Sequence, residues 1–345
     1  MSEHRYYHIS RTGRLTRLAT LSKALSLIEK QGFLWLDYCE TTKEELSVLI
    51  DPLGLHPLSI EDCVDENQIP KIDDYPKNTF ILFNAFDYSN RELSITEVDI
   101  FIGKKFLVTV SRRDSGNRSV LKDLEHIVRF DIENARQGPA FLLHVLLDHV
   151  VDQKFLAIEA LEEELNNHED LILSDISHFN PAELLHLRRE LLALRKSLFH
   201  EREIMVKICR NDCLFIPEKS IFFYRDIYDH LSKFFELTES SRDVVSSLME
   251  IYLSMLNNQM ARAANNTNKT IRRLTLITTV FMPLSFLAGI GGMSEWSMMT
   301  GPANWRIAYP LFLAGMAVIG GIMFLMLRRY GKMQEGRHAK RAGRR

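Results

Sequence analysis

The chain has 345 residues, 46% of them hydrophobic and 26% charged, and its formal net charge of −2 taken alone fits a neutral soluble protein of about two domains. That total conceals two parts, because residues 1–259 carry 43 of the 45 Asp and Glu but 30 of the 43 Lys and Arg, a charge of −13, whereas the last 86 residues carry 13 basic and two acidic side chains, a charge of +11. An acidic body lacks the basic surface that nucleic-acid binding requires, and twenty Phe exclude a disordered chain.

Residues 1–138 are predicted to form a cytosolic α/β domain. Two segments favour helices, residues 21–28 and residues 43–50, the second with Thr41 or Thr42 as a possible cap. Short apolar or alternating runs favour strands at 32–38, 79–86, 98–102 and 106–110, of which the last two form a hairpin joined by residues 103–105.

Long helices are predicted beyond Pro139. Residues 139–217 should form a cytosolic helical hairpin, because the stretches 140–166 and 181–207 are rich in Leu and free of internal Gly and Pro. Residues 218–290 should form one helix about 110 Å long at 1.5 Å per residue. No single compact core needs such a helix, so we expect partner copies in a closed homo-oligomer.

Two uncharged stretches predict membrane spans, residues 274–290 and 307–327, which leave 291–306 as an external loop and 328–345 as a basic cytosolic tail. Basic residues flank the spans on the outer sides of this hairpin, so the positive-inside rule places both termini in the cytoplasm. No signal peptide is evident, and we expect a multi-pass protein of the plasma (inner) membrane, in contact with the lipid bilayer, with reduced cysteines.

A stripe of residues three and four apart follows the long helix into the first span. It passes from amides through bulky apolar side chains to small and hydroxylated ones: Asn258, Ala261, Asn265, Asn268, Ile271, Leu274, Thr278, Met282, Ser285 and Gly289. Amide and hydroxyl oxygens can contact a hydrated cation, and apolar rings can close a pore by dewetting. The stripe therefore predicts a wet channel wall, although the Asn-rich composition favours a loop before the membrane as strongly as a helix.

Several motifs together resemble the CorA family of divalent-cation channels, whose first span typically reads TxxFMPLTFIAGIYGMN. The matching segments here are MPLSF at 282–286, GIGGMS at 289–294, HPLSIED at 56–62, PKIDDY at 70–75, YRDIYDH at 224–230 and YLS at 252–254. The resemblance implies a funnel-shaped homopentamer with an α/β cytosolic domain, a long pore helix, and an outer ring of second spans. It also implies divalent cations as the transported species.

The outer motif departs from the family. In the CorA family a Gly-Met-Asn triplet at the outer mouth of the pore binds the hydrated ion. In this chain Gly292 and Met293 match the triplet, but Ser294 stands in place of Asn, and Gly291 stands in place of the Tyr that usually precedes the triplet. Ser keeps an oxygen but loses about 2 Å of reach, so its ring of contacts should be wider and weaker. Magnesium selectivity is the implied property that this change most reduces.

The resemblance also places a pore Asn at Asn268 when residues are counted back from the first span. Counted forward from Tyr252, the same position falls on Ala261, seven residues earlier. Seven residues are two helical turns, so we interpret the difference as an insertion that lengthens the inner pore and preserves the stripe, with about 20° of drift.

Regulatory residues are carried over from the family as well. Carboxylates of two motifs bind a regulatory cation across a subunit boundary, and these match Asp62, with Glu61 beside it, and Asp226; Asp148 is added by its position. Facing carboxylates repel until a divalent ion neutralises them. Mg²⁺ would then be both substrate and regulator.

Two other functions remain open. One is transport of zinc, cobalt or nickel by the same fold, although the predicted pore contains no His or Cys. The other is a non-conducting membrane-anchored scaffold, which would need no polar stripe. Enzyme activity and an organic cofactor are not expected, because the sequence has no phosphate-binding glycine loop, no His-Glu-x-x-His and no nucleophile elbow.

Overall fold

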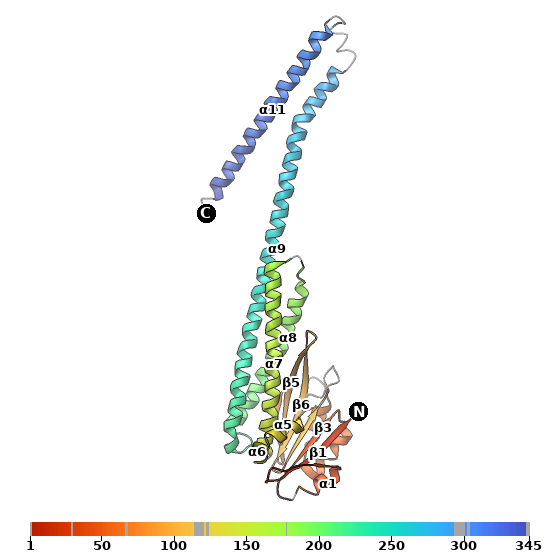
Figure 1. The fold of residues 1–345 in the computed structure, drawn as a ribbon, viewed down its shortest axis with the longest axis vertical. Coiled ribbons are helices and arrows are strands. Elements are labelled where there is room, and N and C mark those ends of the chain that lie inside the picture. Colours follow the sequence, from red (N-terminus) through yellow and green to blue (C-terminus); the bar gives the residue numbers. More distant parts are fainter. Residues whose placement is uncertain are drawn as a thin grey trace. The chain divides into compact units, whose positions relative to one another are not determined.

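The computed structural model describes residues 2–28, 30–65, 68–113, 121, 124–176, 178–292, 301 and 304–342. The chain divides into two compact units, Met1–Tyr252 and Leu253–Arg345, each considered separately below (Figure 1). The helix α9 (Ile221–Gly291) contributes residues to both.

A seven-stranded mixed sheet forms the centre of the first unit, in the order β2-β1-β3-β7-β6-β5-β4. The predicted strands are confirmed as β3 (Phe33–Cys39), β5 (Asn78–Ser89), β6 (Glu92–Gly103) and β7 (Phe106–Ser111), and β6 and β7 form the expected antiparallel hairpin. Three strands were not predicted: β1 (Glu3–Ile9), β2 (Leu15–Leu18) and β4 (Lys71–Asp74). β3 and β7 are parallel, and the other adjacent pairs are antiparallel.

Both faces of the sheet are covered. On β3, Leu34, Leu36 and Tyr38 belong to a core shared with the short helices, whereas Trp35 and Asp37 alternate with them and point to the other face. There α7 packs against β5, as Figure 1 also shows. The unit is thus a three-layer α/β/α sandwich, which confirms the predicted α/β domain.

The short helices differ from the prediction. The first helix, α1 (Leu21–Leu25), ends three residues early, and residues 43–50 do not form one helix but split into α2 (Lys43–Ser47) and α3 (Ile50–Leu53). Thr42 caps α2 in a complete capping box, and Gly54 ends α3 in the left-handed conformation. The remaining short helices are α4 (Pro57–Val64), α5 (Leu124–Phe130) and α6 (Ile132–Ala135).

The predicted long helices are all present, and two of them run further than predicted: α7 to Ser174 instead of residue 166, and α11 to Ala342 instead of residue 327. The long helices are α7 (Pro139–Ser174), α8 (Pro181–Cys209), α9 after a 3₁₀ turn (Glu218–Ser220), and α11 (Trp305–Ala342). The Asn-rich run is helical throughout, so the residues interpreted as an insertion extend the helix. Residues 218–291 and 306–327 lie in helices long and apolar enough to cross a membrane.

A buried ion pair between Lys154 on α7 and Glu201 on α8 contacts the strand β5 of the sheet. Lys154 and Glu201 are both completely buried and paired, and Glu201 also accepts a hydrogen bond from the backbone N–H of Asn84 on β5 at 2.9 Å. The ammonium of Lys154 lies 4.1 Å from the ring centre of Phe83 and 4.5 Å from that of Phe86. Burial lowers the pKa of Lys154 to about 8, against the attraction of Glu201.

Candidate functional site

The described stripe residues all lie on α9 in the second unit. Each of the seven expected to line a pore is exposed in the single chain: Asn268, Ile271, Leu274, Thr278, Met282, Ser285 and Gly289. The stripe thus forms a continuous face with no contact that buries it. Its residues recur on average about every 3.5 positions, the spacing of helices that wind around one another.

The opposite face of α9 packs against α11. A methyl group at Gly320 would lie 3.2 Å from Leu284, and one at Gly291 would lie 2.7 Å from the ring of Phe312. At 100° per residue, the positions 284 and 291 lie about 100–180° around the helix from the nearby stripe residues Met282, Ser285 and Gly289. The basic side chains of Lys269 and Arg273 fall on that far side too, whereas Arg272, four residues after Asn268, lies only about 40° around the helix from it.

Threonine hydroxyls on this helix donate to their own backbone. Thr278 donates to the carbonyl oxygens of Leu274 and Thr275, both at 3.1 Å, and Thr275 donates to that of Ile271 at 2.9 Å. A hydroxyl whose proton is used in this way presents only lone pairs outward. Thr278 therefore offers an acceptor to a cation or to the water around it.

The outer motif is described only at its start. Gly292 follows α9 and donates its N–H to the carbonyl of Ala288 at 3.0 Å, while Met293 and Ser294 lie outside the described residues. Gly291, at the position where Tyr is usual in the CorA family, lies against the ring of Phe312. A side chain at position 291 would have to displace that ring. The ring of Phe312 on α11 therefore occupies the space beside Gly291 that a side chain at 291 would need.

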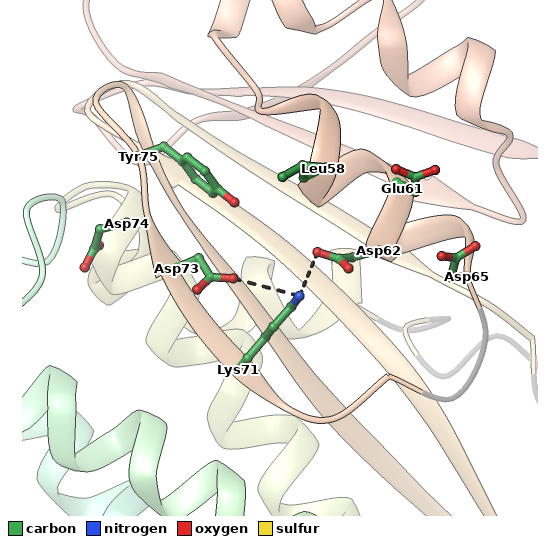
Figure 2. A pocket seen from close by; sticks show the side chains of 8 residues that line it. All are labelled: Leu58, Glu61, Asp62, Asp65, Lys71, Asp73, Asp74 and Tyr75. Atoms are coloured by element: carbon green, nitrogen blue, oxygen red, sulfur yellow. Dashed lines mark hydrogen bonds and ion pairs between the residues drawn. The ribbon is translucent and has the colours of Figure 1, made fainter.

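A second candidate site is an acidic pocket of about 490 Å³ in the first unit (Figure 2). The helix α4 supplies Glu61 and Asp62, and β4 supplies Lys71 and Asp73. His56 starts α4 by accepting the N–H of Leu58, with Pro57 in the first turn, which suits a helix start. The pocket lining is completed by Leu58, Asp65, Asp74 and Tyr75.

Lys71 is the cation among the lining residues, and Lys43 and Lys207 pair with two of the lining carboxylates, Glu61 at 3.2 Å and Asp74 at 2.7 Å. The ammonium of Lys71 lies 2.7 Å from an oxygen of Asp62 and 3.9 Å from an oxygen of Asp73. The side chain of Asp62 is 21% exposed. Both contacts are drawn in Figure 2. Partial burial opposes the charge of Lys71, but the hydrogen bond to Asp62 and the attraction of both carboxylates outweigh this and raise the pKa of Lys71. A divalent ion at Asp62 would compete with this ammonium.

Arg112, which follows β7, was not predicted to be functional. It donates to the backbone carbonyls of Cys63 at 3.3 Å and of Asp65 at 3.2 Å, and also to that of Val64, so it caps the C-terminus of α4 with a positive charge. The helix that carries Asp62 is thereby tied to the middle of the sheet. No local pattern signals this contact, because 48 residues separate the partners Arg112 and Val64.

Asp99 on β6 lies behind α4. Burial, and secondly the charge of Glu97, raise its pKa to about 8, against a hydrogen bond from Cys63 and the attraction of Arg112. At neutral pH Asp99 is therefore mostly protonated and adds little charge beside Asp62. In the unfolded chain this carboxyl ionises near pH 4, whereas in the folded chain it ionises only near pH 8. Between these pH values the folded state holds a proton that the unfolded state has lost, so the free energy of unfolding falls as pH rises.

We expect Asp99→Asn to reduce that pH dependence. The amide cannot ionise, so the free energy of unfolding should decline less from about pH 5 to pH 8, by roughly 2–5 kcal/mol. Urea unfolding followed by the fluorescence of buried Trp35 measures this. A variant with the same slope as the wild type would show that Asp99 is already ionised in the folded chain.

The two other predicted regulatory carboxylates lie near each other, on α7 and α9. Asp226 is 67% exposed and lies 3.7 Å from His230. Burial raises the pKa of Asp148, and the nearby His144 opposes this increase. Burial lowers the pKa of His144, and the negative charges of Asp148 and Asp226 oppose that decrease. The structure therefore groups Asp148 with Asp226, whereas Asp62 and Glu61 line the acidic pocket. Within the described residues, no three of His, Cys, Asp and Glu converge on a metal position.

Comparison with known proteins supplies the context for these sites. A family described as "CorA-like Mg2+ transporter protein" matches residues 30–329. The chain is 30% identical over 279 residues to the cobalt/magnesium transport protein CorA of Thermotoga maritima (80% of this chain, 76% of that protein) and 25% identical over 305 residues to the protein of the same name from Methanocaldococcus jannaschii (88% and 92%). The complete structure of the latter organism's CorA magnesium transporter superposes with a TM-score of 0.68 at 23% identity, covering 94% of this chain and 97% of that one.

Proposed function

The chain belongs to the CorA-like Mg²⁺ transporter family, and from this premise we propose that it conducts divalent cations, Mg²⁺ first among them, passively and driven by the membrane potential. The stripe on α9 is the observation that carries the proposal. It is exposed, is made of uncharged residues and is directed away from α11, and its oxygens can contact an ion that keeps its water.

The pathway requires several copies of the chain. One helix cannot enclose a pore, and a stripe spaced at about 3.5 residues stays on the common axis when helices supercoil around each other. We propose a homopentamer in the plasma (inner) membrane with both termini in the cytoplasm and the α11 helices outside the pore helices. Asn268 would line the inner end, and Gly292, Met293 and Ser294 the outer mouth.

Regulation by cytosolic cation is proposed at the subunit boundary. Asp62 and Glu61 of one subunit would share an ion with Asp226, and with Asp148, of its neighbour. Neither group alone offers three converging ligands within the described residues of one chain, which agrees with a site completed by a second copy. Binding must displace Lys71 from Asp62, so the site should respond to millimolar rather than trace Mg²⁺.

Metal-resolved flux tests the proposed function. Proteoliposomes with an inside-negative potential should take up Mg²⁺ without ATP, and uptake should stop when the potential is collapsed. Comparison with Zn²⁺, Co²⁺ and Ni²⁺ identifies the preferred ion and tests the alternative of a zinc, cobalt or nickel transporter. If none of the four ions enters faster than in protein-free vesicles, the chain is a membrane-anchored scaffold. The proposed chemistry needs no organic cofactor and no catalytic step.

We expect Ser294→Asn to increase the preference for Mg²⁺ over Co²⁺. The longer amide reaches about 2 Å further toward the axis and adds a donor and an acceptor for the water around the ion. Competition flux in proteoliposomes should show a several-fold change in the ratio of the two uptake rates. An unchanged ratio would remove Ser294 from the outer ring.

We expect Asp226→Ala to weaken the protection that Mg²⁺ gives the assembly against protease. Loss of one carboxylate ligand should raise the Mg²⁺ concentration for half-protection about tenfold. Asp243→Ala is a matched control, since Asp243 is also an exposed aspartate of α9 and pairs only locally with Arg242 among the contacts described. Equal protection of both variants would reject the regulatory role of Asp226.

A further inference from the structure

A pocket of about 460 Å³ that the proposed ion pathway does not use lies where the β5–β6 hairpin meets α7 and α8. The hairpin contributes Tyr88 and Arg91, α7 contributes Glu163, Glu164 and His168, and α8 contributes Glu183. Three carboxylates thus face one guanidinium, and this excess of negative charge favours a cation.

His168 is the central group of this pocket. Its side chain is 6% exposed, and its Nε2 is buried without a hydrogen-bond partner. The two ring nitrogens face two carboxylates, with Nε2 3.4 Å from Oε1 of Glu164 and Nδ1 3.5 Å from Oε2 of Glu183. The ring of Phe179 packs edge-on against the imidazole at 5.9 Å between centres. A buried imidazole nitrogen directed at a carboxylate is a ligand pair for a metal ion.

The distance between the two donor atoms fits one shared ion. A nitrogen and an oxygen each about 2.1 Å from a tetrahedrally coordinated metal lie about 3.4 Å apart, and Nε2 of His168 is 3.4 Å from Oε1 of Glu164. The two residues are four apart on α7, so they share one face of the helix.

The surrounding groups hold both ligands in place. Tyr88 donates its hydroxyl to Oε2 of Glu164, which leaves Oε1 for the ion. Glu183 on the far nitrogen can fix the tautomer in which Nε2 is unprotonated, as carboxylates do behind metal-bound histidines.

We propose that His168 and Glu164 bind a transition-metal dication of the Zn²⁺, Co²⁺ or Ni²⁺ type, with Glu183 as the positioning residue. Imidazole nitrogen selects these ions over Mg²⁺, which requires oxygen ligands. Because no third His, Cys, Asp or Glu converges with this pair in the described part of the chain, water completes the coordination and the ion exchanges readily. The site lets the cytosolic unit distinguish these metals from Mg²⁺, and it stands whether or not the stripe conducts.

Equilibrium dialysis of the full-length protein against Zn²⁺, with millimolar Mg²⁺ present, tests the proposal. The wild type should bind one more Zn²⁺ per chain than His168→Gln, and Glu183→Gln should retain the site with about tenfold lower affinity. His186→Gln is the matched control, because His186 also lies four residues from a glutamate, at 3.5 Å from Glu190, but is half-exposed and outside the pocket. Equal Zn²⁺ binding by the wild type and His168→Gln overturns the proposal.

A measurement on the unmodified protein covers the case in which His168→Gln fails to fold. Crystals grown with Co²⁺ should show an anomalous scattering peak within about 2.3 Å of Nε2 of His168. Absence of that peak, in crystals that show Co²⁺ at other positions, overturns the proposal. Mg²⁺ uptake by proteoliposomes is a separate readout, so failure of the metal site and failure of the channel function are distinguishable.

Discussion

Asn268→Lys should reduce Mg²⁺ uptake into proteoliposomes at least 100-fold. An ammonium about 6 Å from a divalent cation raises its energy by about 1.4 kcal/mol even in water, which is roughly tenfold in rate. In an oligomer each subunit contributes one such ammonium, so the repulsion energies add. The lower dielectric constant inside a narrow pore increases each of them. The effect should be largely independent of the Mg²⁺ concentration on the side of the first unit, because the substitution acts on the proposed pathway and not on the proposed regulatory carboxylates.

Asn266→Lys is the control for this variant. Asn266 is also an exposed asparagine of α9, but it lies roughly 200° around the helix from Asn268, on the side of Lys269 and Arg273. The same substitution there should leave uptake within about twofold of the wild type. If the two variants lose uptake equally, the stripe does not face the ion and the proposed pore wall is wrong.

The second large effect is on stability. Lys154→Met should lower the free energy of unfolding of the first unit by about 3–5 kcal/mol, because it leaves the carboxylate of Glu201 buried without its partner. This corresponds to a decrease of the unfolding temperature by about 10 °C for a unit of this size. Heating with detection by the fluorescence of Trp35, which lies in the sheet core, measures the change.

A double variant separates the charge effect from packing. In Lys154→Met with Glu201→Gln, the buried charge is gone, and the amide oxygen can still accept the N–H of Asn84, which bonds Glu201 at 2.9 Å in the wild type. At least half of the lost stability should return. If the double variant is as unstable as Lys154→Met, the loss comes from the removed stem of Lys154 and its contacts with Phe83 and Phe86.

The pattern of hydrophobic residues was sufficient to predict the long strands and helices. The strands at β3, β5 and β7 are buried almost along their whole length, and the long helices contain no internal Gly or Pro until Pro283, so their signals are continuous. The strand β1 was not predicted, because its buried residues Tyr7 and Ile9 alternate with Tyr6 and His8. The side chains of Tyr6 and His8 are partly apolar, so the alternation of apolar and polar residues is weak. The strand β4 is only four residues long and has no apolar alternation.

The Asn-rich run shows where propensity cannot decide. Asn is a weak helix former, and no local rule separates a loop from a helix there. In the structure the helix continues, with Thr267 and Thr270 donating their hydroxyls to carbonyls four residues back, at 3.0 and 3.2 Å. Continuity with the apolar stretches on either side outweighs the local preference.

Site residues divide in the same way. The position of the stripe on one helix follows from its periodicity, and its role in a pore stays a prediction. The partners of Asp62 and of its helix come from other elements. Lys71 lies on β4, and Arg112 reaches α4 from the end of β7. Contacts between separate elements depend on strand order, which a single sequence does not reveal. The pairing of His168 with Glu183 across two helices was missed for that reason.

The contact between Gly291 and Phe312 limits how this protein can diverge. Since a methyl group at 291 would already lie 2.7 Å from the ring, a larger residue there must displace the ring of Phe312, and a smaller residue at 312 removes that conflict. The two positions should therefore co-vary among homologous chains, with an aromatic residue at the place of Gly291 accompanied by a small residue at the place of Phe312. Exchange of both residues together, Gly291→Tyr with Phe312→Ala, should be tolerated where Gly291→Tyr alone is not.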